Sequence, residues 1–303
     1  MSNTQAYEAI AAKIIVALEK GVAPWVQPWK TLGQNIAHPF NAVSRRPYSG
    51  INQVILWMIA NDKGYSSAGW MTYKAASELG GHVRKGEKAT EVVYWKKRSV
   101  EKKVDGRVEM KDGKPVMITI MMVRLFNVFN IAQIDKLPDR FYDGSNKPDV
   151  ELPPNYADWV KATKANIKTG GDRAFYNVVT DSITMPRVKA FETQAHYQAT
   201  LNHELIHWTA HKSRLDRDLT GRFGDASYAA EELVAELGSA FVCADLGIDG
   251  NLRHAEYIGH WIKMLKDDPK AIITASGAAN KAAQYLGRLT GLRKEEAELA
   301  EAA

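Results

Sequence analysis

Residues 191–208 read FETQAHYQATLNHELIHW, and the pattern HELIH at 203–207 within them decides the fold of the second half of the chain. The stretch contains no Gly or Pro, and Leu201, Leu205 and Trp208 recur at steps of four and three, which predicts an α-helix. Two histidines four apart lie on one face of such a helix, one turn apart. Both imidazoles can then reach one divalent ion, since zinc binds imidazole nitrogen at about 2.0–2.1 Å.

Glu204 stands directly after the first histidine, His203, and three residues before the second, His207. It lies too close to His203 to bind the same ion well, yet close enough to hold a water molecule there. In zinc-dependent peptidases with this pattern the metal acidifies the water and the glutamate takes its proton. A chance match is the alternative. A structural zinc site is disfavoured, because such sites are usually rich in cysteine and the chain has only Cys243.

A third ligand has to come from outside this helix. The metzincin continuation would need Gly at 210 and His at 213, but the chain has Ala210 and Ser213, which excludes that class. The gluzincin-like alternative takes a carboxylate from a following helix. Residues 228–247, YAAEELVAELGSAFVCADLG, form such a segment, and Gly247 ends it.

Within this second helix we expect Glu232 to be the third metal ligand. Glu236, four residues on and on the same face, is expected to orient a ligand histidine through its free N–H. Glu231 points about 100° away from Glu232 and is expected to be solvated. His211 lies one turn past His207, but three ligands along one helix cannot close a tetrahedron, so we expect it at the surface or behind a ligand.

Length and composition indicate a soluble protein of two domains. The chain has 303 residues, of which 45% are apolar. The longest unbroken apolar run, at 54–60, is far too short to span a membrane, and the first ten residues lack the features of a signal peptide. We therefore expect no membrane partner. A single cysteine gives no disulfide framework, so we expect a reducing cytoplasm.

The charge differs between the two halves of the chain. Residues 1–150 carry a net charge of +8 and residues 151–303 a net charge of −3. The first half is therefore the candidate for binding a polyanion. Between them, residues 136–155 contain four prolines and a glycine, which is typical of a linker. We expect domains at 1–140 and 156–303, joined by a linker at 141–155.

Both halves combine helices with strands, which predicts the α+β class. In the first half, helices are expected at 4–21, near 51–61 and near 73–79, followed by a hairpin with turns at Asp105-Gly106 and Asp112-Gly113 and a long return strand at 115–130. The second half is expected to be mostly helical with a small antiparallel sheet. Its extended segment at 182–186 is a candidate edge strand that pairs with an extended substrate, and a hairpin capping the sheet is equally compatible.

Aromatic and basic residues alternate in the first half. Fifteen of the 28 aromatic residues lie in residues 1–150, within segments such as PWVQPWK, RRPYSG and VVYWKKR. Single-stranded DNA is bound by this combination, because cations follow the phosphates and aromatic rings stack on unpaired bases. The alternative is that most of the rings are core, as we expect for Trp57 and Trp70. The predicted DNA contacts are Trp25, Trp29, Arg45, Arg46, Tyr48, Arg84, Lys85, Lys88, Tyr94, Lys96, Lys97 and Arg98.

Longer motifs resemble a known family. Residues 18–29, 48–52, 80–96 and 126–133 resemble the N-terminal single-stranded-DNA-binding module of ArdC-type antirestriction proteins, which TraC-type conjugative primases share. Residues 181–211 and 231–248 resemble the zincin-like metallopeptidase domain of the same family. The resemblance covers nearly the whole chain in the same order.

This resemblance implies a plasmid protein that protects incoming conjugative DNA from host restriction. It also implies His203, His207 and Glu232 as ligands of zinc or of another divalent ion such as Mn²⁺, with Glu204 as the catalytic carboxylate. DNA mimicry is disfavoured because the chain is basic overall. Proteolysis of a host restriction protein is one reading. The alternative is that the protein shields single-stranded DNA and its metal site is structural.

Overall fold

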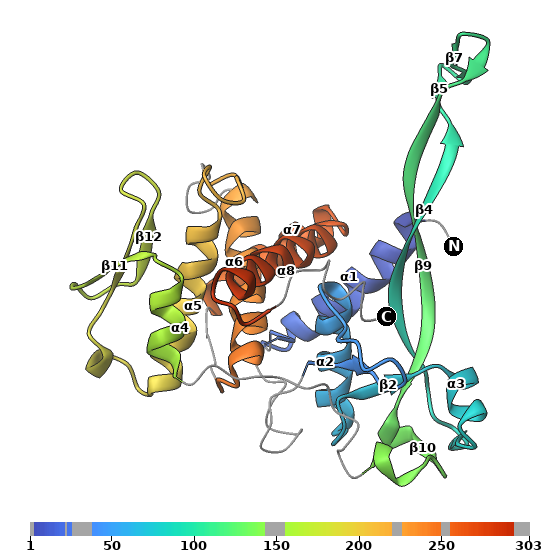
Figure 1. Cartoon of the computed structure of the whole chain (residues 1–303), viewed down its shortest axis with the longest axis horizontal. Coiled ribbons are helices and arrows are strands. Elements are labelled where there is room, and N and C mark those ends of the chain that lie inside the picture. Colours follow the sequence, from blue (N-terminus) through green and yellow to red (C-terminus); the bar gives the residue numbers. More distant parts are fainter. Residues whose placement is uncertain are drawn as a thin grey trace.

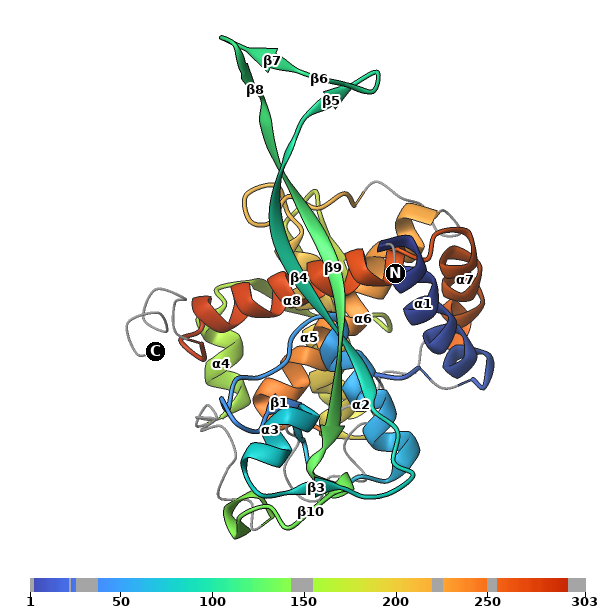
Figure 2. The same cartoon turned by 90° about the vertical axis from the view of Figure 1, so that its right-hand side faces the viewer.

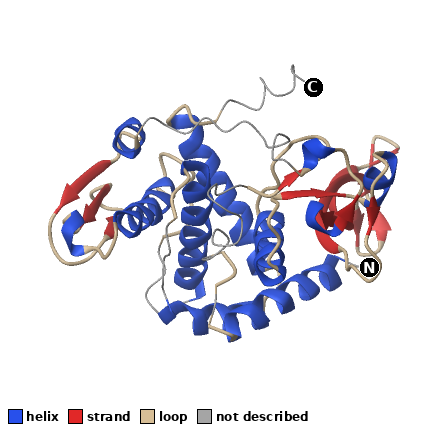
Figure 3. Ribbon diagram, turned by 90° about the horizontal axis from the view of Figure 1, so that it is seen from below, coloured by secondary structure: helices blue, strands red, loops and turns tan. Residues whose placement is uncertain are grey.

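The computed structural model describes residues 3–21, 23–25, 38–142, 155–219, 226–249 and 255–293. Most helices gather in one body, from which a long two-stranded hairpin projects (Figure 1). Helices and strands occur in both halves, so the predicted α+β class is confirmed. Seen from below, the helices lie between the sheet of the first half and the small sheet of the second half (Figure 3).

Helices account for most of the second half and for two long segments of the first. Their bounds are α1 Asn3–Glu19, α2 Ile51–Lys63, α3 Tyr73–Glu78, α4 Tyr156–Ala162, α5 Gln194–Thr209, α6 Ala226–Leu246, α7 Ala255–Asp267 and α8 Ala271–Leu289. The helices predicted in the first half are therefore confirmed, with shifts of a few residues at their ends.

The strands of the first half form a four-stranded sheet in the order β1-β2-β9-β4, with short pairs beside it. Their bounds are β1 Phe40–Asn41, β2 Gly69–Met71, β3 His82–Val83, β4 Thr90–Glu101, β5 Lys103–Val104, β6 Arg107–Val108, β7 Met110–Lys111, β8 Lys114–Pro115, β9 Met117–Asn130 and β10 Ile134–Asp135.

Strands β4 and β9 form the projecting hairpin, which we call the arm. They pair antiparallel over their whole length, from Thr90 opposite Val128 to Glu101 opposite Met117. At the far end the chain folds into two small hairpins, β5–β6 and β7–β8 (Figure 2). Their turns are the predicted Asp-Gly pairs, in which both residues of each pair have positive φ, as tight type I′ turns require.

The small sheet of the second half has the order β11-β13-β12, from β11 Asn166–Thr169, β12 Phe175–Asn177 and β13 Ser182–Met185. β12 and β13 are antiparallel, whereas β11 and β13 are parallel. The prediction of an antiparallel sheet is therefore wrong in this detail. The extra strand β11 is short and polar, and nothing in its sequence pattern had marked it as a strand.

The two halves share one hydrophobic core. A single cluster contains Ile14 of α1 and residues from every helix of the second half. Across the boundary the Trp57 ring lies 5.9 Å from the Phe241 ring, and Trp25 lies 5.7 Å from Trp261. A fragment that ends near residue 140 would expose this surface to water, at about 25 cal/mol for each Å².

The boundary between the halves falls partly outside the described residues. Residues 143–154 of the linker expected at 141–155 lie outside the described residues. The expected domain limits therefore stay a prediction. Within the described part of the chain, no helix combines the length and apolarity needed to cross a bilayer.

A buried polar cluster also joins the two halves. Asp245, near the end of α6, accepts two hydrogen bonds from Arg293, at 2.6 and 2.7 Å. The Nε2 atom of His38 lies 2.7 Å from the same carboxylate, and the other ring nitrogen of His38 lies 2.7 Å from the Gln53 amide. Burial raises the pKa of Asp245, but the neighbouring His38 and Arg293 outweigh burial and lower it.

This cluster predicts a pH-dependent stability. At pH 7, Asp245→Asn should lower the free energy of unfolding by about 1.5–3 kcal/mol, the usual worth of hydrogen bonds to a charged group. The pKa of Asp245 is lower in the folded protein than in the unfolded chain. The difference in the free energy of unfolding between the wild type and Asp245→Asn should therefore have its full size above the pKa of an unfolded aspartate, about 3.9. It should vanish as the pH falls through the pKa of Asp245 in the folded protein. Urea unfolding of the whole chain at several pH values measures it.

The matched control is Asp62→Asn, because the Asp62 side chain is 57% exposed. Among the described residues, it forms an ion pair only with the adjacent Lys63. This control should change stability by less than about 0.5 kcal/mol. A difference for Asp245→Asn that stays constant into strong acid would contradict the role given to the carboxylate charge.

Candidate metal site

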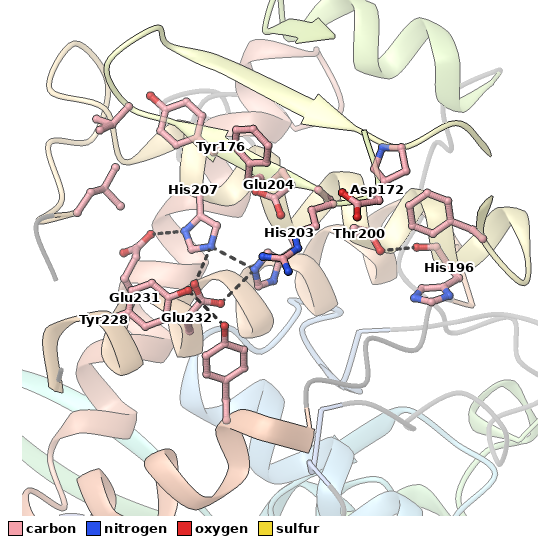
Figure 4. A pocket seen from close by; sticks show the side chains of 18 of the residues that line it. Asp172, Tyr176, His196, Thr200, His203, Glu204, His207, Tyr228, Glu231 and Glu232 are labelled. Atoms are coloured by element: carbon pink, nitrogen blue, oxygen red, sulfur yellow. Dashed lines mark hydrogen bonds and ion pairs between the residues drawn. The ribbon is translucent and has the colours of Figure 1, made fainter. Parts of the chain in front are cut away.

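The two histidines of the HELIH pattern lie on α5, one turn apart. The helix begins with a side-chain cap, in which the Thr193 hydroxyl accepts a hydrogen bond from the His196 N–H at 3.0 Å. The Nε2 atoms of His203 and His207 lie 3.1 Å apart, and their rings are nearly perpendicular. Both nitrogens therefore face the same point on the surface of α6 (Figure 4).

Glu232 of α6 occupies that point. Its two carboxylate oxygens lie 3.4 Å from His203 Nε2 and 3.5 Å from His207 Nε2. Among the described residues, His203, His207 and Glu232 form the group whose ligand atoms converge, all within 4.8 Å of one another. The structure thus brings together the three residues predicted as ligands.

These distances fit a tetrahedral ion. Ligand atoms about 2.0–2.1 Å from zinc, at tetrahedral angles, lie about 3.3–3.4 Å from one another.

The site also stabilises positive charge. Burial alone would lower the pKa of His207, but its contacts with Glu231 and Glu232 outweigh burial and raise the pKa to about 10. The pKa of Glu232 is strongly lowered: its burial acts in the opposite direction, but His203 and His207 outweigh it.

Glu231 corrects the sequence analysis, which expected it to be solvated. It is only 9% exposed, and one of its oxygens lies 3.1 Å from Nδ1 of the ligand candidate His207. Arg217 donates to both oxygens of Glu231, at 2.8 and 3.0 Å, and to the Ile206 carbonyl of α5 at 2.8 Å. The prediction is wrong because the chain after α5 returns across the start of α6 and places Arg217 over it.

A signal for this burial exists in the sequence. Most residues of the stretch 228–247 are apolar, which is typical of a helix that is covered over most of its surface. The partner Arg217 could not have been found in this way, because the contact joins a loop to a helix 14 residues further along the chain.

Glu236 lies near His203, and Glu204 lies in the cavity beside both histidines. Glu236 is 2% exposed, and its carboxylate lies 3.7 Å from Nδ1 of His203. Each histidine therefore has a carboxylate on the side away from Glu232, Glu231 behind His207 and Glu236 behind His203. Glu204 is 6% exposed and lines the same cavity as the histidines (Figure 4).

A glycine lets α5 and α6 approach closely at this site. A Cβ atom on Gly238 would lie only 2.8 Å from the side chain of Ile206. Next to it, the Ser239 hydroxyl donates to the Ala199 carbonyl at 2.9 Å, which bonds α6 directly to the backbone of α5. A glycine within a helix costs about 1 kcal/mol relative to alanine, so its presence here serves the contact between the helices.

The site opens into a cavity of about 830 Å³. One wall is β12, the edge strand of the small sheet, with Phe175 and Tyr176 in the lining. The sequence analysis had considered 182–186 as the edge strand, but that segment contains β13, the central strand. The edge next to the site belongs to the preceding strand, because the parallel strand β11 covers the other side of β13.

Arg214 fastens this wall to α5. It donates to the Asp181 carboxylate and to the Tyr176 hydroxyl, and its guanidinium lies 3.9 Å from the centre of the Trp208 ring. These contacts lower the pKa of Asp181, since the hydrogen bond from Arg214 outweighs burial. The edge strand therefore has a fixed position relative to the histidines.

Two tyrosines close the opposite side of the cavity. Tyr228 of α6 and Tyr257 of α7 both line it, and their hydroxyl oxygens lie 3.2 Å apart. His260, on the same helix as Tyr257, is exposed and is not in the lining.

The predicted DNA contacts do not form one cluster. Arg84, Lys85 and Lys88 lie around β3, at the end of the hairpin opposite to the tip of the arm, whereas Tyr94 and Lys96 to Arg98 lie on the arm (Figure 2). Arg84 is engaged by Glu87 at 2.8 Å and by Asp135 at 3.4 Å. Its charge is therefore largely balanced within the fold.

The remaining predicted contacts lie nearer the body. Arg45 and Arg46 are exposed in a turn, and Tyr48 is half-buried against the core. Trp25 is 1% exposed and packs on Trp261, so it cannot stack on a base, and its prediction as a DNA contact is wrong. The extended Pro-Trp segment had suggested a presented ring, but the ring fills the core between the halves. Trp29 lies outside the described residues.

Comparison with known protein families matches both halves. Residues 4–129 match the model of the N-terminal domain of anti-restriction factor ArdC, and residues 154–278 match a zincin-like metallopeptidase model. Together the two models cover the arm, α5 and α6.

Curated relatives are longer or of equal length. A DNA primase TraC of Escherichia coli is 42% identical over 92% of this chain, and a second one is 38% identical over the same share, but the chain spans only 20% and 27% of those primases. The uncharacterized protein y4eC of Sinorhizobium fredii is 35% identical, with 93% of this chain and 92% of that protein covered.

Solved structures give the most complete match. The metal-free crystal structure of the antirestriction protein ArdC from plasmid R388 superposes with a TM-score of 0.78 at 37% identity, and covers 95% of this chain and 99% of that one. The Mn(II)-bound structure of the same protein gives a TM-score of 0.73 at 39% identity, covering 94% and 97%. On its fold, its two domain matches and its sequence identity, the chain belongs to the ArdC family of antirestriction proteins.

Proposed function

We propose that this protein protects incoming conjugative DNA from host restriction, with a divalent-metal-dependent peptidase site in its second half and a surface for single-stranded DNA in its first. The single observation that carries the peptidase proposal is the convergence of His203, His207 and Glu232 at distances of 3.1–3.5 Å. The family supports it, since the R388 relative is described as an antirestriction protein and has been solved with Mn(II).

The chain's own residues fit this chemistry. His203, His207 and Glu232 would hold the ion, whose Lewis acidity would polarise a peptide carbonyl and lower the pKa of water. Two nitrogens and one carboxylate are the donor set of catalytic zinc sites, and manganese is the alternative suggested by the R388 relative. Glu204 would accept the proton of the attacking water and pass it to the leaving amine.

The carboxylates behind the histidines would orient them. Glu231 accepts from Arg217 and lies within hydrogen-bond distance of His207, and Glu236 lies near His203. Such partners fix the tautomer and direction of a ligand imidazole. The edge strand β12 along the cavity would accept an extended peptide, and a host restriction protein is the proposed substrate.

Charge and aromatic content support the DNA-binding part. The first half carries a net charge of +8, and residues 90–130, from the start of β4 to the end of β9, carry nine cationic against five acidic side chains. Two relatives that share both halves are named DNA primases. A protein that meets incoming DNA would act in the cytoplasm, with which the free, buried thiol of Cys243 is compatible.

The ligand assignment predicts graded metal loss. Glu232→Ala removes an anionic ligand and should abolish stable metal binding, whereas Glu231→Gln only weakens the orientation of His207 and should reduce affinity about 10- to 100-fold. The exposed Glu192 lies just before α5, and Glu192→Ala is the control that should keep a full metal content. Elemental analysis after dialysis against stepped chelator concentrations measures the order. A full metal content in Glu232→Ala would refute the assignment of Glu232 as the third ligand.

The role of Glu204 predicts a loss of activity without a loss of metal. Glu204→Gln keeps the size of the side chain but cannot accept a proton, and the loss of a general base typically costs 10²–10⁴-fold in rate. A restriction-protection assay during conjugation should show loss of protection by this variant, with normal metal content. Full protection by metal-loaded Glu204→Gln would instead favour shielding of DNA by a protein whose metal is structural.

A further inference from the structure

The arm has two faces of different composition. In an antiparallel pair, side chains directly opposite each other point to the same side, and successive side chains alternate. Tyr94 stands opposite Arg124, Lys96 opposite Met122 and Arg98 opposite Ile120. The even-numbered residues of both strands therefore share one face, which we call the even face: Val92, Tyr94, Lys96, Arg98, Val100, Ile118, Ile120, Met122, Arg124, Phe126 and Val128.

The charge of the arm strands is concentrated on this face. The even face carries Lys96, Arg98 and Arg124 and no carboxylate. The odd face carries one cation, Lys97, and two carboxylates, Glu91 and Glu101. The net charge is thus +3 on one face and −1 on the other. Alternation along a strand predicts that Tyr94 and Lys96 lie on one face and Trp95 and Lys97 on the other, and the register agrees.

The odd face is also covered near the body. Trp95 packs against Tyr7 of α1, with ring centres 6.3 Å apart, and the Val123 N–H donates to the Asn3 side chain at 3.0 Å. On the even face, by contrast, Tyr94 is 54% exposed and Phe126 46% exposed, with their rings 5.6 Å apart and perpendicular.

We propose that the even face of the arm is a track for single-stranded DNA. This inference rests on the proposed single-stranded-DNA binding and assigns it a place. Phe126 and Tyr94 stack on unpaired bases. Arg124, which stands opposite Tyr94, and Lys96 and Arg98, which lie further toward the tip, contact phosphates. Ile118 and Ile120, 39% and 38% exposed, extend the contact toward the tip.

The arrangement favours a single strand over other polyanions. A duplex keeps its base faces stacked inside, so it would use the three cations but leave both rings without partners. An acidic protein would also be attracted by the positive charge, but its binding would require exposed apolar area for packing and would not require exposed ring faces. The pair of exposed, mutually perpendicular aromatic rings next to these cations therefore points to unpaired bases. The free-standing arm gives such a strand access from the side (Figure 2).

The charges are tested with two adjacent lysines in the full-length chain. Lys96 and Lys97 are both exposed and lose the same charge on replacement by alanine, but they lie on opposite faces. In fluorescence anisotropy with a labelled single-stranded oligonucleotide at several salt concentrations, Lys96→Ala should reduce the slope of log affinity against log salt by about 0.7, and Lys97→Ala should leave it unchanged. Joint replacement of Lys96, Arg98 and Arg124 should reduce it by about 2.

The rings are tested by changes that keep apolar bulk. Phe126→Leu should weaken binding about 5- to 100-fold with little change in slope, and Phe126→Tyr should retain it. Tyr94→Leu is a second, independent variant. Met117→Ser on the odd face, at a side chain 53% exposed, is the control for loss of apolar surface and should bind as the wild type does.

The outcomes separate the two proposals. If the wild-type chain does not bind single-stranded DNA, the DNA-binding function and the track both fail. If it binds but Lys97→Ala costs as much as Lys96→Ala, the track is overturned and the function stands. Equal losses of duplex and single-strand affinity in Phe126→Leu would also overturn the track. A changed sedimentation coefficient of this variant, without a change in its DNA affinity, would overturn it as well, because it would identify the even face as a contact between copies of the chain.

Discussion

The close contact between α5 and α6 is the constraint on which the site depends. HELIH places two imidazoles on α5, but a third donor reaches them only because Gly238 lets α6 come against Ile206. Ser239 then bonds the two helices through the Ala199 carbonyl. The spacing of His203 and His207 is set within α5, whereas the distances of 3.4 and 3.5 Å from Glu232 to these histidines depend on how closely α6 approaches α5. A methyl group at 238 would change the site without touching any ligand.

Local patterns could be predicted from the sequence, whereas contacts between distant segments could not. The spacing of His203 and His207, the position of Glu232 on a following helix and the Asp-Gly turns of the arm are each fixed within a few residues, so periodicity and turn chemistry reveal them. The burial of Glu231 depends on Arg217, which a loop brings over α6. Pattern arguments carry no information about such a return of the chain.

The aromatic residues show the same limit more sharply. Trp25 and Tyr94 occur in similar mixtures of apolar and basic residues, yet Trp25 fills the core against Trp261 and Tyr94 lies at the surface. Composition counted both as DNA contacts. What separates them is the partner each finds: α7 covers Trp25, while α1 covers only the odd face of the arm. The net charge of the first half is likewise correct as a total but does not indicate which face carries it.

The common core of the two halves has a consequence for how this unit recurs among proteins. Trp57 and Ile14 are buried by residues of the second half, so neither half retains a complete interior without the other. A gene rearrangement that copied one half would deliver a chain with an open apolar surface, prone to aggregate. The TraC primases match 92% of this chain within a quarter or so of their own length. Packing of this kind ties the two halves to each other, and those primases contain both of them.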